Sequence, residues 1–221
     1  MASVRVPKSS ERWTVFNAFA ALGAAALSVG CADLRPALLV SGCSLGWLLW
    51  RHAALRNGAA NLVTVCRMGL LCAALSFAAE RGAWVAAAAC LLFTLDGVDG
   101  WLARRLDAAS ELGAQLDMET DSHALLLLDL QLVIHDGYPG WVLIAGALRY
   151  LYVITRWLAG PRELHERRSS IGRWIFSLVF VSRIVACLPN TQPLATPLLA
   201  IATLAVGASF APDFRALRAA D

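Results

Sequence analysis

Four aspartates in one short window are the residues of this sequence best suited to chemistry. Asp96 and Asp99 are three residues apart, and Asp117 and Asp121 are four apart, so each pair shares one face if the segments are helical. Carboxylate oxygens are the ligands that Mg²⁺ and Mn²⁺ prefer. Two such ions, about 3.5–4 Å apart, can hold both the attacking and the leaving oxygen of an in-line displacement. The aspartates therefore predict a two-metal site for phosphoryl chemistry.

Residues around the aspartates fit the same chemistry. Gly100 and Gly113 have no side chain and leave room for a nucleotide. Arg104, one turn beyond Gly100, can reach a phosphate. Glu119 is out of phase with the last two aspartates, and we interpret it as a surface residue or one that supports the site from outside. Helix caps and surface acids are the alternative interpretation of single aspartates, and the spacing of all four disfavours it.

The composition places this site in a membrane protein. The chain has 221 residues, of which 58% are hydrophobic and 16% charged, and its mean hydropathy is +0.60. An acid at membrane depth is costly, so it is by default a candidate functional residue. The six cysteines form no CxxC pair, and the four histidines do not cluster, so we assign neither set to the chemistry. The net charge of +3, without a long basic run, argues against a nucleic-acid partner.

We expect an all-α fold, a polytopic transmembrane helical bundle. Segments long enough to span a bilayer, about 20 residues each, lie near residues 14–31, 35–50, 61–79, 83–103, 113–135, 141–159, 171–188 and 193–211. The first two have few polar residues, and residues 51–58 separate them from the rest. We therefore expect a two-helix N-terminal addition, residues 1–58, and a six-helix core, residues 59–221.

The basic residues orient the bundle, because short cytoplasmic loops collect Lys and Arg. With the N-terminus inside, the opposite side of the membrane carries only Arg35 and Arg81. The cytoplasmic side carries the other basic residues that flank the expected spans: Arg5, Lys8, Arg12, Arg51, Arg56, Arg104, Arg105, Arg162, Arg167, Arg168, Arg173, Arg215 and Arg218. We therefore expect both chain ends and the aspartates at the cytoplasmic face.

The spacing of the aspartate window also matches a known pattern. It reads D-x-x-D-G-x-x-A-R-x8-G-x3-D-x3-D, and each defined position is filled by, in order, Asp96, Asp99, Gly100, Ala103, Arg104, Gly113, Asp117 and Asp121. This pattern resembles that of the CDP-alcohol phosphatidyltransferase family. The resemblance implies a six-helix core over residues 61–211. It also implies that Asp96, Asp99 and Asp117 are metal ligands, and that Asp121 is both a metal ligand and the general base.

A second segment strengthens the resemblance. Asn61, Thr64 and Arg67 are similar to the N-x-x-T-x-x-R that opens the first core helix of this family, whose polar residues face the nucleotide. Asn61 also fits as a helix cap.

A weaker match lies at Gly172-Arg173, where many relatives have Gly-Lys. With Arg149 and Arg156, Arg173 could supply positive charge to an anionic acceptor or to the donor phosphate, and positive-inside topology is an equal explanation.

The function implied by the resemblance is a step of phospholipid synthesis. A phosphatidyl group would pass from CDP-diacylglycerol to a small hydroxylated acceptor, with release of CMP and with two Mg²⁺ or Mn²⁺ ions. A CDP-choline or CDP-ethanolamine type of phosphotransferase, in which the lipid is the acceptor, would use the same residues. A small cation-coupled transporter is the alternative from another class. It predicts acids deep in the bundle, whereas these acids cluster at one end.

The residue after the fourth aspartate bears on the identity of the acceptor. Glycerophosphate-using relatives tend to have Lys after the fourth aspartate and inositol-phosphate-using ones Arg, whereas this chain has Ser122. Those two acceptors are therefore disfavoured.

Members of the family form homodimers, so a homodimer is a candidate state. The Ala- and Arg-rich composition suggests a bacterial inner membrane, with the active site facing the cytoplasm.

The orientation can be tested with single cysteines in a background that lacks the native six. A cysteine at Ser110 should react with a membrane-impermeant thiol reagent only when the reagent reaches the cytoplasm. A cysteine at Asn190 should react from the outside. Labelling of position 110 in intact cells would overturn both the orientation and the cytoplasmic site.

Overall fold

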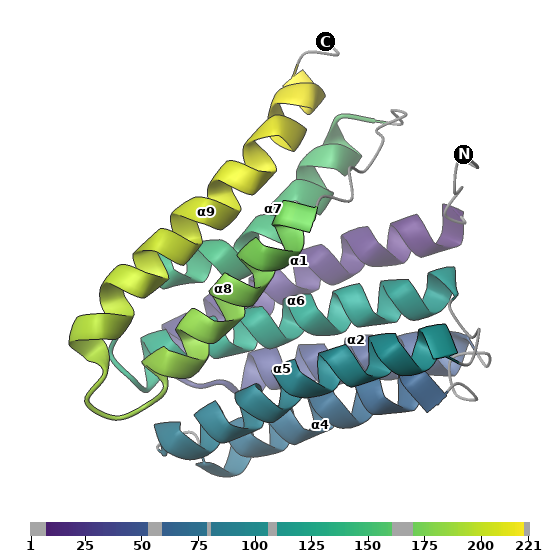
Figure 1. Cartoon of the computed structure of the whole chain (residues 1–221). Helices are drawn as coiled ribbons and strands as arrows, with labels where there is room; N and C mark the ends of the chain where they lie inside the picture. The colour runs from purple at the N-terminus through teal and green to yellow at the C-terminus, as the bar shows by residue number, and fades with distance from the viewer. Residues whose placement is uncertain (1–7, 53–58, 79–80, 106–109, 161–169, 219–221) are drawn as a thin grey trace.

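The computed structural model describes residues 8–52, 59–78, 81–105, 110–160 and 170–218 (Figure 1). Every regular element within these ranges is helical, as the sequence predicts. In chain order the elements are α1 Lys8–Cys31, α2 Arg35–Arg51, α4 Ala59–Ala78, α5 Gly82–Arg105, α6 Glu111–Ile134, the short 3-10 helix η1 Gly140–Val142, α7 Leu143–Leu158, α8 Ser170–Ala186 and α9 Gln192–Arg218.

Among the described residues, three helical segments are long and apolar enough to cross a membrane by themselves: Arg12–Cys31, Gly140–Leu158 and Gln192–Arg215. The sequence predicted eight spans, so the described helices support this prediction only in part. Two further apolar segments, Asn61–Phe77 and Gly82–Asp96, are shorter than a full span. Helices α5 and α6 do not count as full apolar spans because the acids of the candidate site interrupt their apolar runs.

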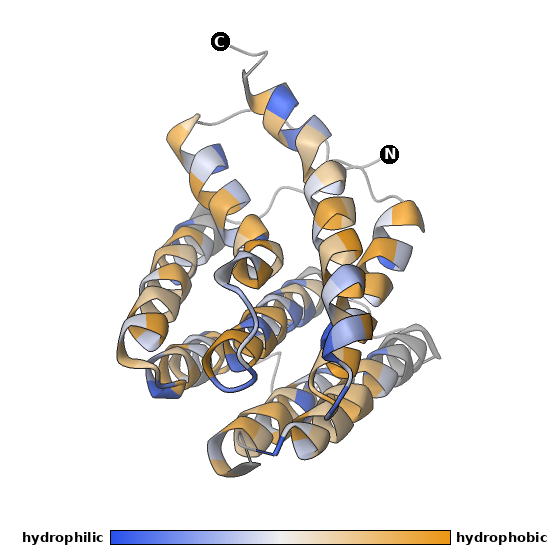
Figure 2. Ribbon diagram, turned by 90° about the vertical axis from the view of Figure 1, so that its left-hand side faces the viewer, coloured by the Kyte–Doolittle hydropathy of each residue, from blue (hydrophilic) through white to orange (hydrophobic). Residues whose placement is uncertain are grey.

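Many large apolar side chains are exposed on the bundle, and Figure 2 shows how hydrophobic residues are distributed along the helices. Phe77, Trp174 and Leu204 are among the most exposed of them. A surface so rich in exposed apolar groups is unusual for a soluble monomer and suits contact with lipid. The described helices therefore have the surface of a membrane protein.

Helix α6 lies at the centre of the bundle and packs against α1, α2, α4, α7 and α8 (Figure 1). Its second half is buried on all sides, including every residue from Ser122 to Leu132. Burial around the whole circumference makes this half of α6 an interior helix, although it carries polar residues such as His123 and Asp129. The N-terminal helices α1 and α2 pack against α6 as well, and α1 also packs against α7. They are therefore in direct contact with the helix that carries Asp117 and Asp121.

The end of the bundle away from the aspartates is closely packed. The hydroxyl of Tyr138 donates to the carbonyl oxygen of Ala186 at 3.3 Å, and the Gln192 amide donates to the carbonyl oxygen of Asp136 at 3.3 Å. A Cβ atom on Gly82 would lie 2.1 Å from the Cys187 carbonyl oxygen, so only glycine fits there. Burial raises the pKa of the Asp136 carboxyl, and a hydrogen bond from Gln131 partly offsets this effect. These contacts hold α5, α6, α8 and α9 together at this end.

A fully buried ion pair joins α6 to α8 within the core. Arg183 Nε lies 2.9 Å from Asp129 Oδ1, and the Gly146 amide of α7 donates to Asp129 Oδ2 at 2.9 Å. The guanidinium also donates to Ser182 Oγ at 2.8 Å and to Thr203 Oγ1 of α9 at 3.5 Å. In the sequence, both partners are charged residues inside apolar runs, which is the local signal of such a pair, and we did not predict the pairing from it.

Breaking the pair should destabilise the fold. Asp129→Ala leaves a buried guanidinium without its carboxylate, which costs about 3–5 kcal/mol, or on the order of 10 °C in Tm for a chain of this size. Thermal unfolding of the detergent-solubilised chain measures the change. Asp129→Leu combined with Arg183→Met removes both charges and should recover most of the loss.

The matched control is the exposed pair of Asp33 with Arg35, whose atoms lie 3.7 Å apart. Asp33→Ala should change the stability by about 1 kcal/mol or less. Equal losses for Asp129→Ala and Asp33→Ala would contradict the role given to the buried pair.

Candidate active site

Three of the four aspartates meet at one end of the bundle. Asp96 comes from α5, and Asp117 and Asp121 lie one turn apart on α6. One carboxylate oxygen of each lies within 4.8 Å of the others. Among the described residues, α4 packs against both α5 and α6, the two helices that carry these aspartates. The predicted convergence of these three carboxylates is therefore present, and α4 mediates it.

Arg67 of α4 lies among the three carboxylates. Its Nη2 atom is 3.2 Å from Asp96 Oδ1 and 3.1 Å from Asp121 Oδ1, and its Nη1 atom is 3.3 Å from Asp117 Oδ1. The Arg67 side chain is only 1% exposed, whereas those of Asp96, Asp117 and Asp121 are 36%, 41% and 17% exposed. The guanidinium thus lies on the inner side of the cluster and the carboxylates on the outer side. The resemblance predicted that Arg67 faces a nucleotide, whereas its contacts in the structure are with the aspartates.

This arrangement suits a divalent cation. Three carboxylates and one guanidinium leave an excess of two negative charges among the named side chains. Like charges this close repel one another, and a bound cation would relieve the repulsion. Hard oxygen ligands are what Mg²⁺ and Mn²⁺ require. The exposure of Asp96 and Asp117 lets an ion and its water ligands reach the cluster. Asp96, Asp117 and Asp121 are therefore the described residues that could hold a metal.

The second half of the motif on α5 lies outside the described side chains. The backbone of α5 is helical through Arg105, which puts Asp99 one turn after Asp96. The side chains of Asp99, Ala103 and Arg104, and the surroundings of Gly100, are outside the described residues. Their assigned roles as a metal ligand and as nucleotide contacts remain predictions.

Gly113 brings the start of α6 close to α4. A Cβ atom on Gly113 would lie 3.0 Å from Asn61 Oδ1 and 3.0 Å from Ser110 Oγ, so a larger residue would push against both. The Ser110 hydroxyl accepts the hydrogen bond from the Gly113 amide at 3.0 Å and caps α6. Asn61 is the third residue of α4, which begins at Ala59, so it lies inside the first turn and does not serve as the helix cap. Thr64 is buried one turn further along.

The three arginines considered for an anionic substrate have different surroundings. Arg173 is exposed in the first turn of α8, and no other atom lies within 4 Å of a Cβ built on Gly172. Arg156 is half-buried near the end of α7. The guanidinium of Arg149 contacts Glu119 Oε1 at 2.8 Å and donates to Ser122 Oγ at 2.8 Å. Its charge is therefore balanced by Glu119.

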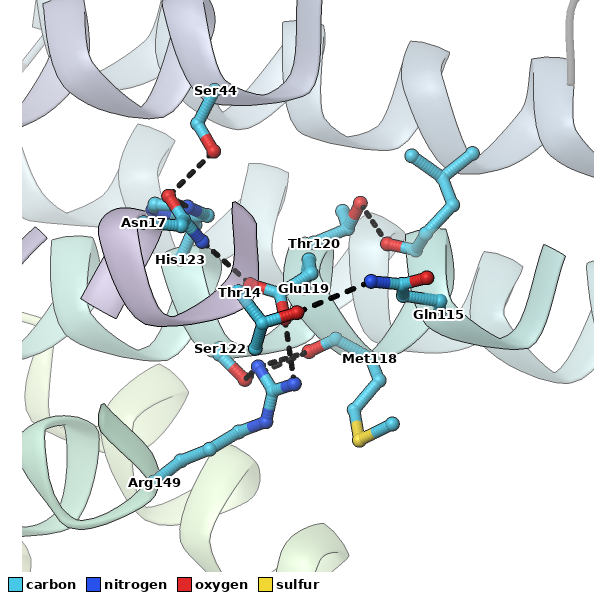
Figure 3. Close-up of polar contacts among 11 residues, drawn as sticks. Thr14, Asn17, Ser44, Gln115, Met118, Glu119, Thr120, Ser122, His123 and Arg149 are labelled. Carbon is cyan, nitrogen blue, oxygen red and sulfur yellow. Dashed lines mark hydrogen bonds and ion pairs between the residues drawn. The ribbon is translucent and has the colours of Figure 1, made fainter. Parts of the chain in front are cut away.

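The surroundings of Glu119 differ most from the surface position considered for it from the sequence. Its side chain is buried on the face of α6 opposite the aspartates, where it accepts a hydrogen bond from Asn17 of α1 at 2.6 Å (Figure 3). His123, which we did not assign to the chemistry, is buried beside Asn17, with Nε2 3.2 Å from Asn17 Oδ1. The local signal for a buried role of Glu119 was an acid inside a segment expected to lie in the membrane. Its partners come from distant parts of the chain and could not be read from the sequence.

Comparison with known proteins agrees with the motif. The model of the CDP-alcohol phosphatidyltransferase family matches residues 58–209. In Arabidopsis thaliana, CDP-diacylglycerol–inositol 3-phosphatidyltransferase 1 is 32% identical over 131 residues, which are 58% of this chain and 57% of the relative. The probable CDP-diacylglycerol–inositol 3-phosphatidyltransferase 2 is 31% identical over 149 residues, 65% of this chain and 66% of the relative. The chain thus spans 57% and 66% of the length of these curated relatives. No solved structure matches significantly.

Metal binding by the three carboxylates can be measured without substrate. Asp96→Asn and Asp117→Asn each remove a negative charge and should weaken Mn²⁺ binding by more than about 10-fold. Replacing a residue that only contacts a metal ligand already weakens metal binding by about 10- to 100-fold. Electron paramagnetic resonance of free Mn²⁺ in a titration of the solubilised chain gives the affinity. Asp213→Asn, at an exposed acid of α9, is the control and should bind like the unmodified chain. If both site variants bind Mn²⁺ as the control does, the cluster is not a metal site.

Proposed function

Because the chain belongs to the CDP-alcohol phosphatidyltransferase family, we propose that it transfers a phosphatidyl group from CDP-diacylglycerol to a small hydroxylated acceptor and releases CMP. The observation that carries this proposal is the meeting of Asp96, Asp117 and Asp121 around the buried Arg67. These residues provide the negative charge and the oxygen ligands that a metal-dependent phosphoryl transfer needs. The family is membrane-bound, in agreement with the apolar surface of the described helices.

We expect Asp96, Asp99, Asp117 and Asp121 to hold two Mg²⁺ or Mn²⁺ ions. When bound, these ions would neutralise charge on the diphosphate of the donor. Arg67 has a separate role in this proposal. Its contacts with three carboxylates hold their side chains in position before a cation arrives, and they reduce the repulsion among them.

Asp121 acts as the general base in this reaction. Its carboxylate takes the proton of the acceptor hydroxyl while the hydroxyl oxygen bonds to the β-phosphorus of the donor. The bond from this phosphorus to the bridging oxygen breaks, and CMP leaves with that oxygen. The acceptor keeps the phosphatidyl group. Asp121 is the least exposed of the three described aspartates, which limits competition by bulk water for the proton.

The nucleotide is expected beside the first turns of α4 and α6. Asn61 and Thr64 lie on α4, and Gly113 allows the start of α6 to approach Asn61 closely. Gly100 and Ala103 would leave space on α5, and Arg104 and Arg173 would contact phosphate groups. We retain residues 1–58 and 59–221 as the two parts of the chain. The start of the family match at residue 58 supports this boundary.

Inositol is the first acceptor to test. Both plant relatives are named for transfer to inositol, a small polyol without a phosphate. The residue after Asp121 is Ser122, which disfavours the two phosphorylated acceptors considered above. A CDP-choline type of reaction with a lipid acceptor is the alternative within the family.

The homodimer and the cytoplasmic orientation remain proposals. The relatives are plant proteins, so they lend no support to the bacterial inner membrane suggested by composition.

Release of CMP by the purified chain tests the proposal. In mixed micelles with CDP-diacylglycerol, CMP release should require both inositol and Mg²⁺ or Mn²⁺, and a chelator should abolish it. Asp121→Asn keeps the shape of the side chain and cannot accept the proton, so the turnover number should fall by about 10²- to 10⁴-fold or more. Asp213→Asn should leave turnover unchanged.

The possible outcomes separate the alternatives. CMP release from CDP-choline with diacylglycerol, and none from CDP-diacylglycerol, would reverse the roles of lipid and head group. Full activity in chelator would exclude metal dependence. Turnover of Asp121→Asn within a few-fold of the unmodified chain would remove the general-base assignment.

A further inference from the structure

Helix α6 carries acids on two opposite faces. Successive residues of an α-helix are rotated by about 100°, so Asp117 and Asp121 point in nearly the same direction. Glu119, halfway between them in sequence, points to the other side of the helix. The aspartates contact Arg67 of α4, whereas Glu119 contacts Asn17 of α1 and lies 2.8 Å from Arg149 of α7. Whatever fixes Glu119 therefore also sets the direction in which the aspartates point.

Asn17 connects Glu119 to both N-terminal helices. Its amide nitrogen donates to Glu119 Oε2 at 2.6 Å, and its amide oxygen accepts from Ser44 Oγ of α2 at 2.5 Å (Figure 3). The same oxygen lies 3.2 Å from His123 Nε2, and His123 Nδ1 lies 3.0 Å from Ser41 Oγ of α2. All five side chains are buried. Asn17 thus links both α1 and α2 to Glu119 of α6, and Ser41 adds a direct contact between α2 and α6.

A second contact between α1 and α6 lies one turn before the first. The Gln115 amide donates to Thr14 Oγ1 at 3.2 Å (Figure 3). Two contacts at successive turns define both the rotation and the height of one helix against another. If α6 slipped by one residue, its side chains would turn by about 100° and shift by about 1.5 Å. A metal site depends on ligand distances that are defined to a few tenths of an ångström, so it would not survive such a slip.

The buried polar contacts make this register specific. Contact between apolar helix surfaces in lipid is non-directional, and small shifts cost little. A buried carboxylate that loses its partners is strongly unfavourable. The residues that provide these contacts on α1 and α2 lie before residue 58, where the match to the family begins. The family match therefore does not include this part of the chain.

We propose that Asn17 is a positioning residue, and that α1 and α2 act through the Asn17–Glu119 hydrogen bond to hold Asp117 and Asp121 in the geometry that binds metal. This inference rests on the function proposed above, because it requires the aspartates to bind a cation. It assigns a role to the N-terminal two-helix addition that is distinct from insertion into the membrane.

Direct Mn²⁺ binding to the full chain in lipid nanodiscs, without substrate, tests the proposal. Asn17→Ala should weaken Mn²⁺ binding by about 3- to 10-fold, less than the 10- to 100-fold typical of residues that contact a metal ligand directly. In turnover, the Mg²⁺ concentration for half-maximal rate should rise by a similar factor.

The matched control is Ser28→Ala. Ser28 is also a buried polar residue of α1, and its hydroxyl accepts from the Ala37 amide at the start of α2 at 3.2 Å. It supports the α1–α2 hairpin and has no contact with α6 among the described hydrogen bonds. A purely structural contribution of α1 would give Ser28→Ala and Asn17→Ala the same Mn²⁺ affinity, and that result would overturn the proposal.

The outcomes also separate this proposal from the proposed function. If the unmodified chain binds Mn²⁺, and Asp117→Asn weakens binding but Asn17→Ala does not, only the positioning role fails. If the unmodified chain binds no Mn²⁺, both proposals fall. Should Asn17→Ala not yield folded protein, Ser44→Ala removes only the hydroxyl that donates to Asn17. It should weaken Mn²⁺ binding more than Ser28→Ala does, and equal affinities for these two variants would overturn the positioning role.

Discussion

A guanidinium buried in an apolar helix bundle must have negative partners, and the candidate site is organised around that constraint. Arg67 is almost completely removed from solvent. A buried charge without a partner would be very costly. Its partners come from α5 and α6, so the pairing brings three helices together at one point. Because the carboxylates outnumber the guanidinium, negative charge remains on their outer side. One interaction thus positions the carboxylates and leaves the charge that a divalent cation would neutralise.

The same constraint recurs along α6. Asp117 and Asp121 pair with Arg67 of α4, Glu119 pairs with Arg149 of α7, and Asp129 pairs with Arg183 of α8. Lipid is as apolar as a leucine side chain, so helices in a membrane gain little from the hydrophobic effect between them. Directional polar contacts can then define how the helices are arranged. Helix α6 is the element through which most of these contacts pass.

The arrangement also suits a substrate that is part lipid and part nucleotide. The aspartates lie at one end of the bundle and are partly exposed, while the opposite end is closely packed around Tyr138 and Cys187. Between the two ends, apolar side chains cover the outer surface. The proposed donor, with a soluble head and two acyl chains, would need both a polar end and a lipid-facing side, and the described helices provide both.

The sequence alone indicated the family of this protein and its helical, strongly apolar character. The spacing of Asp96, Asp117 and Asp121 indicated a shared site because helical periodicity is a local property, and the apolar composition indicated a helical bundle. The roles of Arg67, Glu119 and Asn17 were decided only by the tertiary structure. Arg67 is 50 residues from Asp117, and Asn17 is 102 residues from Glu119. No local pattern relates such residues, because their contacts arise when separate helices pack together and each buried charge takes the partner that packing brings within reach.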